Sequence, residues 1–210
     1  MSTIALTGVN KYRSTRIPGA EVWALHEPGS VHALCEVVAA HKPELIIELG
    51  TGNGGITLPL HETCPEADLL TFDLFTDPPG SEFITTNQGR FTDGWHYSYP
   101  PEFLRGNTPR AWFGPQVRFY AAETTAGVPA EAREALSEDR RTCVYCDGGN
   151  TAAEVAGFAH HLRTGDLLGV HDWGAMVNET AETQHLGFFR RHRWEVFEAN
   201  GWMTRFWVRV

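Results

Sequence analysis

Short apolar runs alternate with segments of helical periodicity along most of the chain. Apolar residues recur at helical spacing over about 30–41, and Lys42-Pro43 then ends the predicted helix. The same alternation continues downstream. Strands are expected at 44–49, 69–72, 117–121, 142–146 and 167–171, and helices at 56–62, 130–136, 151–163 and 179–191. Continuously apolar strands separated by helices predict an α/β domain with a mostly parallel sheet covered by helices on both faces.

The C-terminal part of the chain departs from this rhythm. Two more strands, at 194–197 and 203–210, are predicted to close the sheet as an antiparallel pair, because Asn200-Gly201 between them is a turn signal. Earlier in the chain, the helix expected at 151–163 carries a capping-box pattern, with Thr151 as its N-cap and Glu154 three residues later.

The length of 210 residues fits one domain spanning 1–210. Within it, residues 1–29 are rich in turn formers and are either a lid or a contact of a homo-oligomer. Residues 74–114 lack periodicity and are rich in aromatic residues and proline. Because so long a loop inside a compact domain is usually functional, we predict a substrate lid there, with a satellite core as the alternative.

Charge and composition narrow the choice of partners. The chain has 17 Lys and Arg against 26 Asp and Glu, a net charge of −9. An acidic surface disfavours nucleic acids and anionic membranes. No apolar stretch approaches the ~20 residues that span a bilayer, and no secretion signal is seen, so a cytoplasmic location is expected.

Cys143 and Cys146 lie three apart on a predicted strand and point to opposite faces, which favours buried thiols over a disulfide or a metal site.

Polar residues follow every strand predicted for the parallel sheet. They are Glu48 with the glycine run, Asp73, Glu123, Asp147, and the pair His171-Asp172. A single acid after a strand usually caps the next helix. In an open α/β sheet, however, ligands bind at the carboxyl ends of the strands, so this series predicts a binding site.

The glycine run has two functional interpretations. The spacing Gly50, Gly52, Gly55, with Asp73 placed to hold a ribose, is typical of dinucleotide binding. Counted instead from Glu48 through Gly50, Gly52 and Gly54, the run suits a methionine-like tail lying over a sharp backbone turn. A purely structural role, in which the glycines only permit a tight turn, is the third possibility.

Motifs at several strand ends together resemble those of a known family. Residues 48–54, Asp73, and the triplet Ala122-Glu123-Thr124 resemble the motifs of class I S-adenosylmethionine-dependent methyltransferases, and the resemblance covers nearly the whole length. Within that fold, residues 41–55, 147–149 and 165–172 look like the cephalosporin-hydroxylase-type and macrocin-type O-methyltransferases. A Rossmann-like sheet with a closing antiparallel strand pair is therefore expected.

The resemblance implies a role for each matching position. S-adenosylmethionine would bind through a set of residues at the first three strand ends: Glu48, Gly50, Thr51, Gly52, Asn53 and Gly54 at the methionine portion, Asp73 at the ribose, and Glu123 and Thr124 near the adenine. No such role follows from the spacing alone.

The resemblance also implies a divalent metal, magnesium or manganese, bound by Asp147, His171 and Asp172 as the catalytic group. Such an ion would hold the substrate hydroxyl and lower its pKa. His171 stands where the family usually has an acid, which shifts the preference towards manganese, iron or zinc. The alternative is that Asp147 and Asp172 only cap the helices that follow them.

Asn150 stands where the family often has a general base, and an amide cannot accept a proton. His96 in the predicted lid is a candidate replacement.

The leading hypothesis is a metal-assisted O-methyltransferase acting on a small hydroxylated molecule. A dinucleotide-dependent oxidoreductase and a non-catalytic binding module with the same fold are the alternatives.

Overall fold

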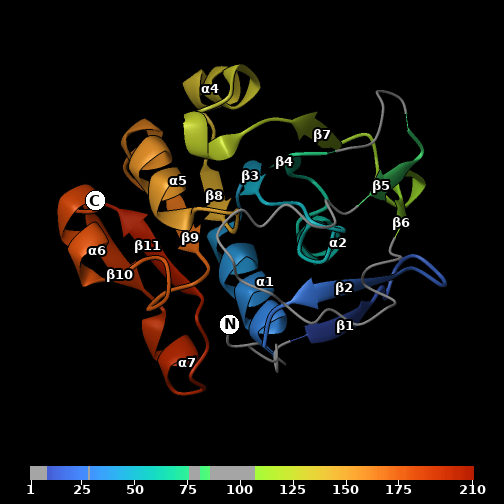
Figure 1. Cartoon of the computed structure of the whole chain (residues 1–210), viewed down its shortest axis with the longest axis horizontal. Helices are drawn as coiled ribbons and strands as arrows, with labels where there is room; N and C mark the ends of the chain where they lie inside the picture. Colours follow the sequence, from blue (N-terminus) through green and yellow to red (C-terminus); the bar gives the residue numbers. More distant parts are fainter. Residues whose placement is uncertain (1–8, 28, 76–80, 86–106) are drawn as a thin grey trace, which may run out of the picture.

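A seven-stranded sheet forms the centre of the computed structural model, which describes residues 9–27, 29–75, 81–85 and 107–210 (Figure 1). The strand order is β10-β11-β9-β8-β3-β4-β7. The strands are β3 (Leu45–Leu49), β4 (Asp68–Asp73), β7 (Val117–Ala121), β8 (Thr142–Cys146), β9 (Leu167–Val170), β10 (Phe189–His192) and β11 (Arg205–Arg209). The first five pair in parallel, whereas β11 is antiparallel to both β9 and β10. The predicted fold class is therefore confirmed.

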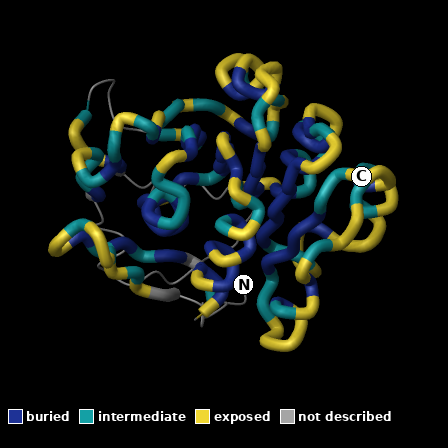
Figure 2. Tube along the Cα trace, turned by 180° about the vertical axis from the view of Figure 1, so that it is seen from behind, coloured by how far each residue is buried: buried dark blue, intermediate teal, exposed yellow. Residues whose placement is uncertain are grey.

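Helices cover both faces of the sheet. One face carries α1 (Ser30–His41) and α2 (Thr57–Thr63), and the other carries α4 (Ala130–Ser137), α5 (Thr151–Phe158) and α6 (Glu179–His185). The central strands β3, β8 and β9 are buried along their whole length, whereas the helices keep exposed outer surfaces (Figure 2). Cys143 belongs to the core on the α1 side and Cys146 to the core on the α5 side, and both thiols are free, as predicted.

The N-terminal segment contains a hairpin that the sequence analysis did not predict. Strands β1 (Val9–Arg13) and β2 (Glu21–Leu25) pair antiparallel, and Val22 and Ala24 are buried in the core that α1 and α2 share. The hydroxyl of Tyr12 donates to Glu62 of α2 over 2.6 Å. Residues 9–27 are thus packed onto the domain.

The C-terminal prediction needs two corrections. The helix expected over 179–191 ends at His185, and the part after it forms β10. Residues 194–197 are not a strand but belong to helix α7 (Trp194–Glu198), because Trp194 and Phe197 bury one side at helical spacing. The closing antiparallel pair exists, but it consists of β10 and β11 joined through α7 rather than a tight hairpin at Asn200-Gly201.

The described ends of the 74–114 insertion form a small structure of their own. Strands β5 (Phe83–Thr85) and β6 (Asn107–Pro109) pair antiparallel, and the 3-10 turn η1 (Arg110–Trp112) follows. Ile84 and Phe113 are buried in the core on the α1 side. Residues 76–80 and 86–106, with His96 among them, lie outside the described residues, so the lid stays a prediction there.

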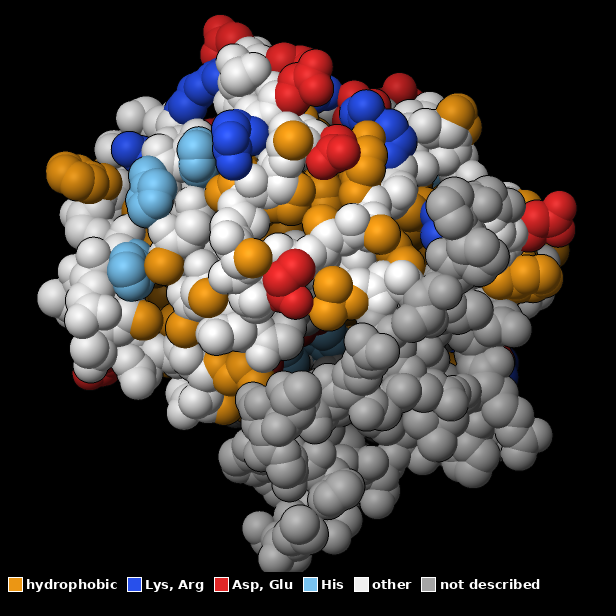
Figure 3. Space-filling view, turned by 45° about the horizontal axis from the view of Figure 1, so that its top comes forward, with side chains coloured by type: hydrophobic (Ala, Val, Ile, Leu, Met, Phe, Trp, Pro, Cys, Tyr) orange, Lys and Arg blue, Asp and Glu red, His pale blue; other side chains and the backbone are white. Residues whose placement is uncertain are grey.

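Within the described ranges, no helix combines the length and hydrophobicity needed to cross a bilayer. On the face shown in Figure 3, Lys and Arg side chains lie beside Asp and Glu side chains rather than gathering into a continuous basic surface.

Candidate active site

The carboxyl ends of β4, β3, β8 and β9 lie next to one another along one edge of the sheet. The chain builds β3, β4 and β7 in one direction and then returns to place β8 and β9 on the other side of β3. The switch of direction therefore falls between β3 and β8, where open α/β sheets bind their ligands. All the predicted site residues lie at or just after the carboxyl ends of these strands and β7.

The glycine loop after β3 is held in a left-handed backbone conformation. Gly50, Gly52 and Gly54 have φ values of 92°, 53° and 83°. A Cβ at Gly50 would overlap the backbone carbonyl of Asp147, so only glycine lets the loop lie against the end of β8. Gly52, in contrast, faces open space. The loop is thereby fixed at its base and open at its tip.

Glu48 lies at the end of β3, beneath this loop, and is fully buried. The hydroxyls of Thr57 and Thr71 donate to its Oε2 over 2.6 and 2.5 Å. Burial outweighs these two hydrogen bonds and raises the pKa of Glu48 to about 8. Its Oε1 is also buried and has no hydrogen-bond partner among the described residues.

The neighbouring loop residues Thr51 and Asn53 are both buried. The Thr51 hydroxyl forms a hydrogen bond with that of Thr71, and the Asn53 carbonyl accepts one from Thr108 of β6 over 2.6 Å. The insertion therefore contacts the glycine loop directly.

Asp73 ends β4 and turns towards the glycine loop. It accepts hydrogen bonds from the backbone N–H of Gly52 over 2.7 Å and of Leu74 over 2.6 Å. These contacts place a carboxylate at the tip of the loop.

Glu123 and Thr124 follow β7 and differ in exposure. Glu123 is exposed and caps the 3-10 turn η2 (Thr124–Ala126) through the backbone N–H of Thr125. Thr124 is buried and donates to Glu154 of α5 over 2.5 Å, and Glu154 also accepts from Gly148 over 3.1 Å. Thr124 therefore ties the ends of β7 and β8 together through α5.

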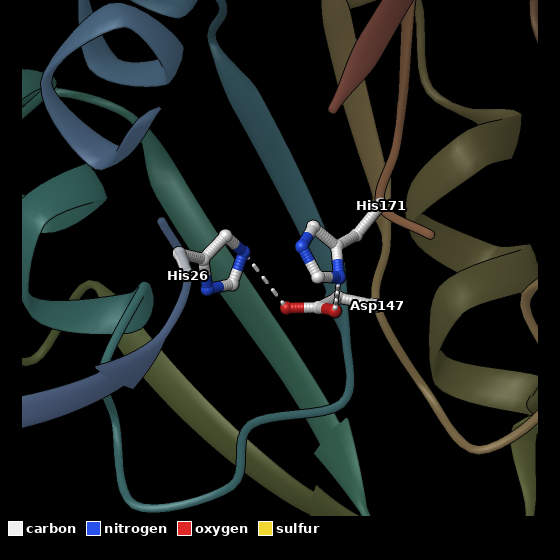
Figure 4. A group of neighbouring side chains, drawn as sticks. All are labelled: His26, Asp147 and His171. Atoms are coloured by element: carbon white, nitrogen blue, oxygen red, sulfur yellow. Dashed lines mark ion pairs between the residues drawn. The ribbon is translucent and has the colours of Figure 1, made fainter. Parts of the chain in front are cut away.

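Asp147, His171 and Asp172 converge at the ends of β8 and β9. His26 joins Asp147 and His171 from the other side (Figure 4). His171 Nδ1 lies 3.0 Å from Asp147 Oδ1 and 3.2 Å from Asp172 Oδ1. His26, which follows β2, places its Nε2 3.3 Å from the other oxygen of Asp147 and 2.9 Å from the hydroxyl of Tyr145. One ligand atom each from His26, Asp147 and His171 can be chosen so that all lie within 4.8 Å of one another.

The two imidazoles of this cluster differ in charge. Burial alone would lower the pKa of His171, but the adjacent carboxylates of Asp147 and Asp172 outweigh it and raise that pKa well above its usual value. Burial, together with the charge of His171, lowers the pKa of His26. The ring centroids are 4.2 Å apart. Both shifts favour the proton on His171 over a proton on His26.

The sequence analysis missed His26, although a signal for it exists. Val22, Ala24 and His26 alternate along β2 and its end, and all three are buried. This period of two places His26 on the inner face of the hairpin. Which residues that face would meet depends on how the hairpin docks, and the strand pattern does not contain that information.

Comparisons with known proteins agree with this architecture. No protein-family model matches the sequence, and no curated protein sequence matches it significantly. Among solved structures, an SAH-bound methyltransferase from Podospora anserina superposes with a TM-score of 0.52 at 12% identity, covering 86% of this chain and 78% of that one. CmcI gives 0.54 at 13% identity, with 89% and 73% covered. An O-methyltransferase family protein from Burkholderia thailandensis gives 0.52 at 11% identity, with 86% and 55% covered.

The chain has the fold of a class I methyltransferase. At these identities the likeness concerns the fold, and the activity must be argued from the site.

The caps of α5 and α6 are asparagines, not the aspartates of the site. The side chain of Asn150 is the N-cap of α5 and accepts from Ala153 N–H over 3.2 Å, so the predicted capping box at Thr151 and Glu154 is wrong. The cap of α6 is Asn178. Asp147 and Asp172 are therefore not the caps of these helices, and their carboxylates face the two histidines instead.

Proposed function

We propose that the protein transfers a methyl group from S-adenosylmethionine to a hydroxyl of a small molecule, assisted by a divalent metal ion. The observation that carries this proposal is the contact between Gly50 and the backbone of Asp147. Through it, the glycine loop and the acid–histidine cluster sit side by side across the point where the sheet changes direction. An electrophile on the first and a hydroxyl on the second would meet there.

The glycine-loop half fits S-adenosylmethionine, which supplies an electrophilic methyl group when bound. Gly50, Gly52 and Gly54 would bind the methionine portion together with Thr51 and Asn53, since the tip of the loop at Gly52 is open. The unpartnered Oε1 of Glu48 is available beneath the loop for a ligand amine. Asp73 would hold the ribose hydroxyls, and the exposed Glu123 would lie near the adenine.

The other half fits a cation. Asp147 and Asp172 place two carboxylates beside the buried His171, so that two carboxylates and an imidazole offer ligand atoms to one ion. When bound, a divalent ion supplies Lewis-acid activation of a hydroxyl. In this proposal Asp147, His171 and Asp172 hold the ion and orient the acceptor. A structure of the CmcI D160 form with Mg and SAM, at a TM-score of 0.52, supports a metal in this fold.

Asn150 has no part in the proton transfer, because it cannot accept a proton and its side-chain oxygen is used by α5. The protein residues of the site thus bind and position the reactants.

Calorimetric titration with S-adenosylhomocysteine and, separately, with NADH tests the proposal first. We expect micromolar affinity for S-adenosylhomocysteine, about 8 kcal/mol, and none for NADH. Transfer of labelled methyl from S-adenosylmethionine to a panel of sugars, catechols and phenols, with and without EDTA, then tests the reaction. Binding of NADH alone would favour the oxidoreductase alternative. Binding of S-adenosylhomocysteine without turnover on any acceptor would favour a non-catalytic module.

A further inference from the structure

We propose that His26 is a ligand of the metal, so that two imidazoles and the carboxylate of Asp147 hold a divalent transition-metal ion in preference to magnesium. The inference deepens the proposed function, since it concerns the metal of the same site. It assigns a binding role to the N-terminal hairpin and reassigns Asp172 from ligand to positioning residue.

The geometry of the three side chains carries the proposal. Ligand atoms bound to one ion at about 2.0–2.2 Å lie roughly 3–4.4 Å from one another. His26, Asp147 and His171 offer atoms that all lie within 4.8 Å, and Asp147 separates the two rings with one oxygen towards each (Figure 4). The side chains therefore need to move little to surround an ion.

Burial is the second observation. His26 and His171 are 3% and 5% exposed, and each keeps a buried ring nitrogen with no hydrogen-bond partner among the described residues, Nδ1 in His26 and Nε2 in His171. Two adjacent imidazoles and a carboxylate in the core are costly to desolvate. Coordination to a cation offsets that cost for all three groups at once.

The donor set decides which ions the site prefers. Magnesium takes oxygen ligands in a near-ideal octahedron and retains much of its water, whereas imidazole suits iron, cobalt, nickel, copper and zinc. With two nitrogens and one carboxylate, the site selects against magnesium. Asp172 lies outside the three-residue group, and its Oδ1 is 3.2 Å from His171 Nδ1, so it orients that ring.

The hairpin holds His26 firmly enough to serve as a ligand. Tyr12 of β1 is bonded to Glu62 of α2, and the backbone of Trp23 in β2 lies so close to Gly55 that no side chain fits there. The hairpin that carries His26 is thus fixed by contacts with both α2 and Gly55.

Titration of the metal-free full-length chain with CoCl2 and with MgCl2 tests the proposal. Visible absorption reports Co²⁺ coordination, and a rise in melting temperature reports Mg²⁺. We expect Co²⁺ to bind the wild type at least roughly 100-fold more tightly than Mg²⁺. His26→Gln should weaken Co²⁺ binding roughly 10-fold or more, and Asp172→Asn by less, since it only orients a ligand. His32→Gln, at a histidine whose side chain is 81% exposed, is the matched control and should change nothing.

Tyr145→Phe separates a metal ligand from a structural histidine. The Tyr145 hydroxyl shares His26 Nε2 with Asp147, so its removal should leave Co²⁺ affinity unchanged or higher. If His26 served only to hold Tyr145, His26→Gln would bind Co²⁺ like the wild type, and that result would overturn the proposal.

A measurement on the wild type guards against a His26→Gln variant that fails to fold. Proton NMR of the Co²⁺-loaded protein should show two strongly shifted, exchangeable imidazole N–H signals. A single signal, or equal affinity for Co²⁺ and Mg²⁺, would overturn the proposal.

S-adenosylhomocysteine binding measured without metal distinguishes failure of the His26 metal site from failure of the proposed function. If it binds and Co²⁺ does not, this inference fails alone. If Co²⁺ binds through His26 and S-adenosylhomocysteine does not, the proposed function fails and the metal site stands.

Discussion

The two halves of the candidate site satisfy their polar groups in different ways. In the half after β3 and β4, Asp73 and Glu48 receive hydrogen bonds from the backbone of the glycine loop and from threonine hydroxyls. In the half after β8 and β9, the side chains of Asp147 and His171 mainly face each other and His26. The polar groups of the first half are thus held in place by hydrogen bonds within the protein. The second is a cluster of carboxylates and imidazoles that contact one another.

This difference shows why one half was easier to predict than the other. The glycine loop is a contiguous segment, and its conformation follows from residues 50–54 themselves. The acid–histidine cluster combines segments from opposite ends of the chain, and His26 enters it only because the hairpin docks on α2. Neighbouring strands could be inferred from their order, but the docking of the hairpin could not.

The first prediction concerns the contact that joins the two halves. Gly50→Ala should lower the free energy of unfolding by about 3–4 kcal/mol, because a Cβ would overlap the Asp147 carbonyl and the residue has a φ of 92°. Urea denaturation measures the loss.

Gly52→Ala is the matched control for that change. Gly52 has a φ of 53° but open space around it, so the substitution should cost only the conformational strain, about 1 kcal/mol. Equal losses at the two positions would mean that the halves are not fixed to each other.

Glu48 gives the second prediction, on pH dependence. Because burial raises its pKa to about 8, the folded protein retains a proton between roughly pH 4.5 and 8 that the unfolded chain releases. Stability due to this group is therefore complete below the unfolded pKa and falls by about 1.4 kcal/mol per pH unit as the pH rises towards 8.

Glu48→Gln removes this proton exchange. The difference in unfolding free energy between wild type and Glu48→Gln should change by up to about 3 kcal/mol between pH 6 and pH 8, in favour of the variant at the higher pH. Comparing the two proteins cancels the similar contribution of Glu154, whose pKa is raised to about 7 by burial. Parallel stability curves would show that Glu48 is ionised throughout.

The third prediction concerns ligand binding by the half of the site after β3 and β4. Asp73→Ala should weaken S-adenosylhomocysteine binding by about 1–3 kcal/mol, since ribose hydroxyls would lose their acceptor. Asp68→Ala, at the other end of β4, removes a carboxylate that pairs with Arg140 and should leave the affinity unchanged in calorimetry. A similar loss in both variants would point to a general change in the strand rather than to ribose binding.

The sequence predicted the five parallel strands well but misplaced one strand of the closing pair, and its errors share a cause. Residues 194–197 are mostly apolar and suit a strand, but Trp194 and Phe197, three residues apart, bury one side of a helix. Likewise, Thr151 and Glu154 fit a capping box by spacing, but Glu154 is engaged by Thr124 and Gly148. In both places tertiary contacts override a local pattern.

The smallest expected effect is at Asn150, and it tests whether the residue acts only in the fold. Asn150→Ala should cost about 1 kcal/mol of stability, because the first turn of α5 loses its cap. Asn178→Ala removes the corresponding cap of α6, which accepts from Thr180 and Ala181, and should cost a similar amount. If Asn150 only caps its helix, methyl transfer per folded molecule should be the same in both variants and in the wild type. A loss of transfer confined to Asn150→Ala, at matched stability, would show that its amide contacts the reactants. Asn150 would then have a part in the reaction as well as in the fold.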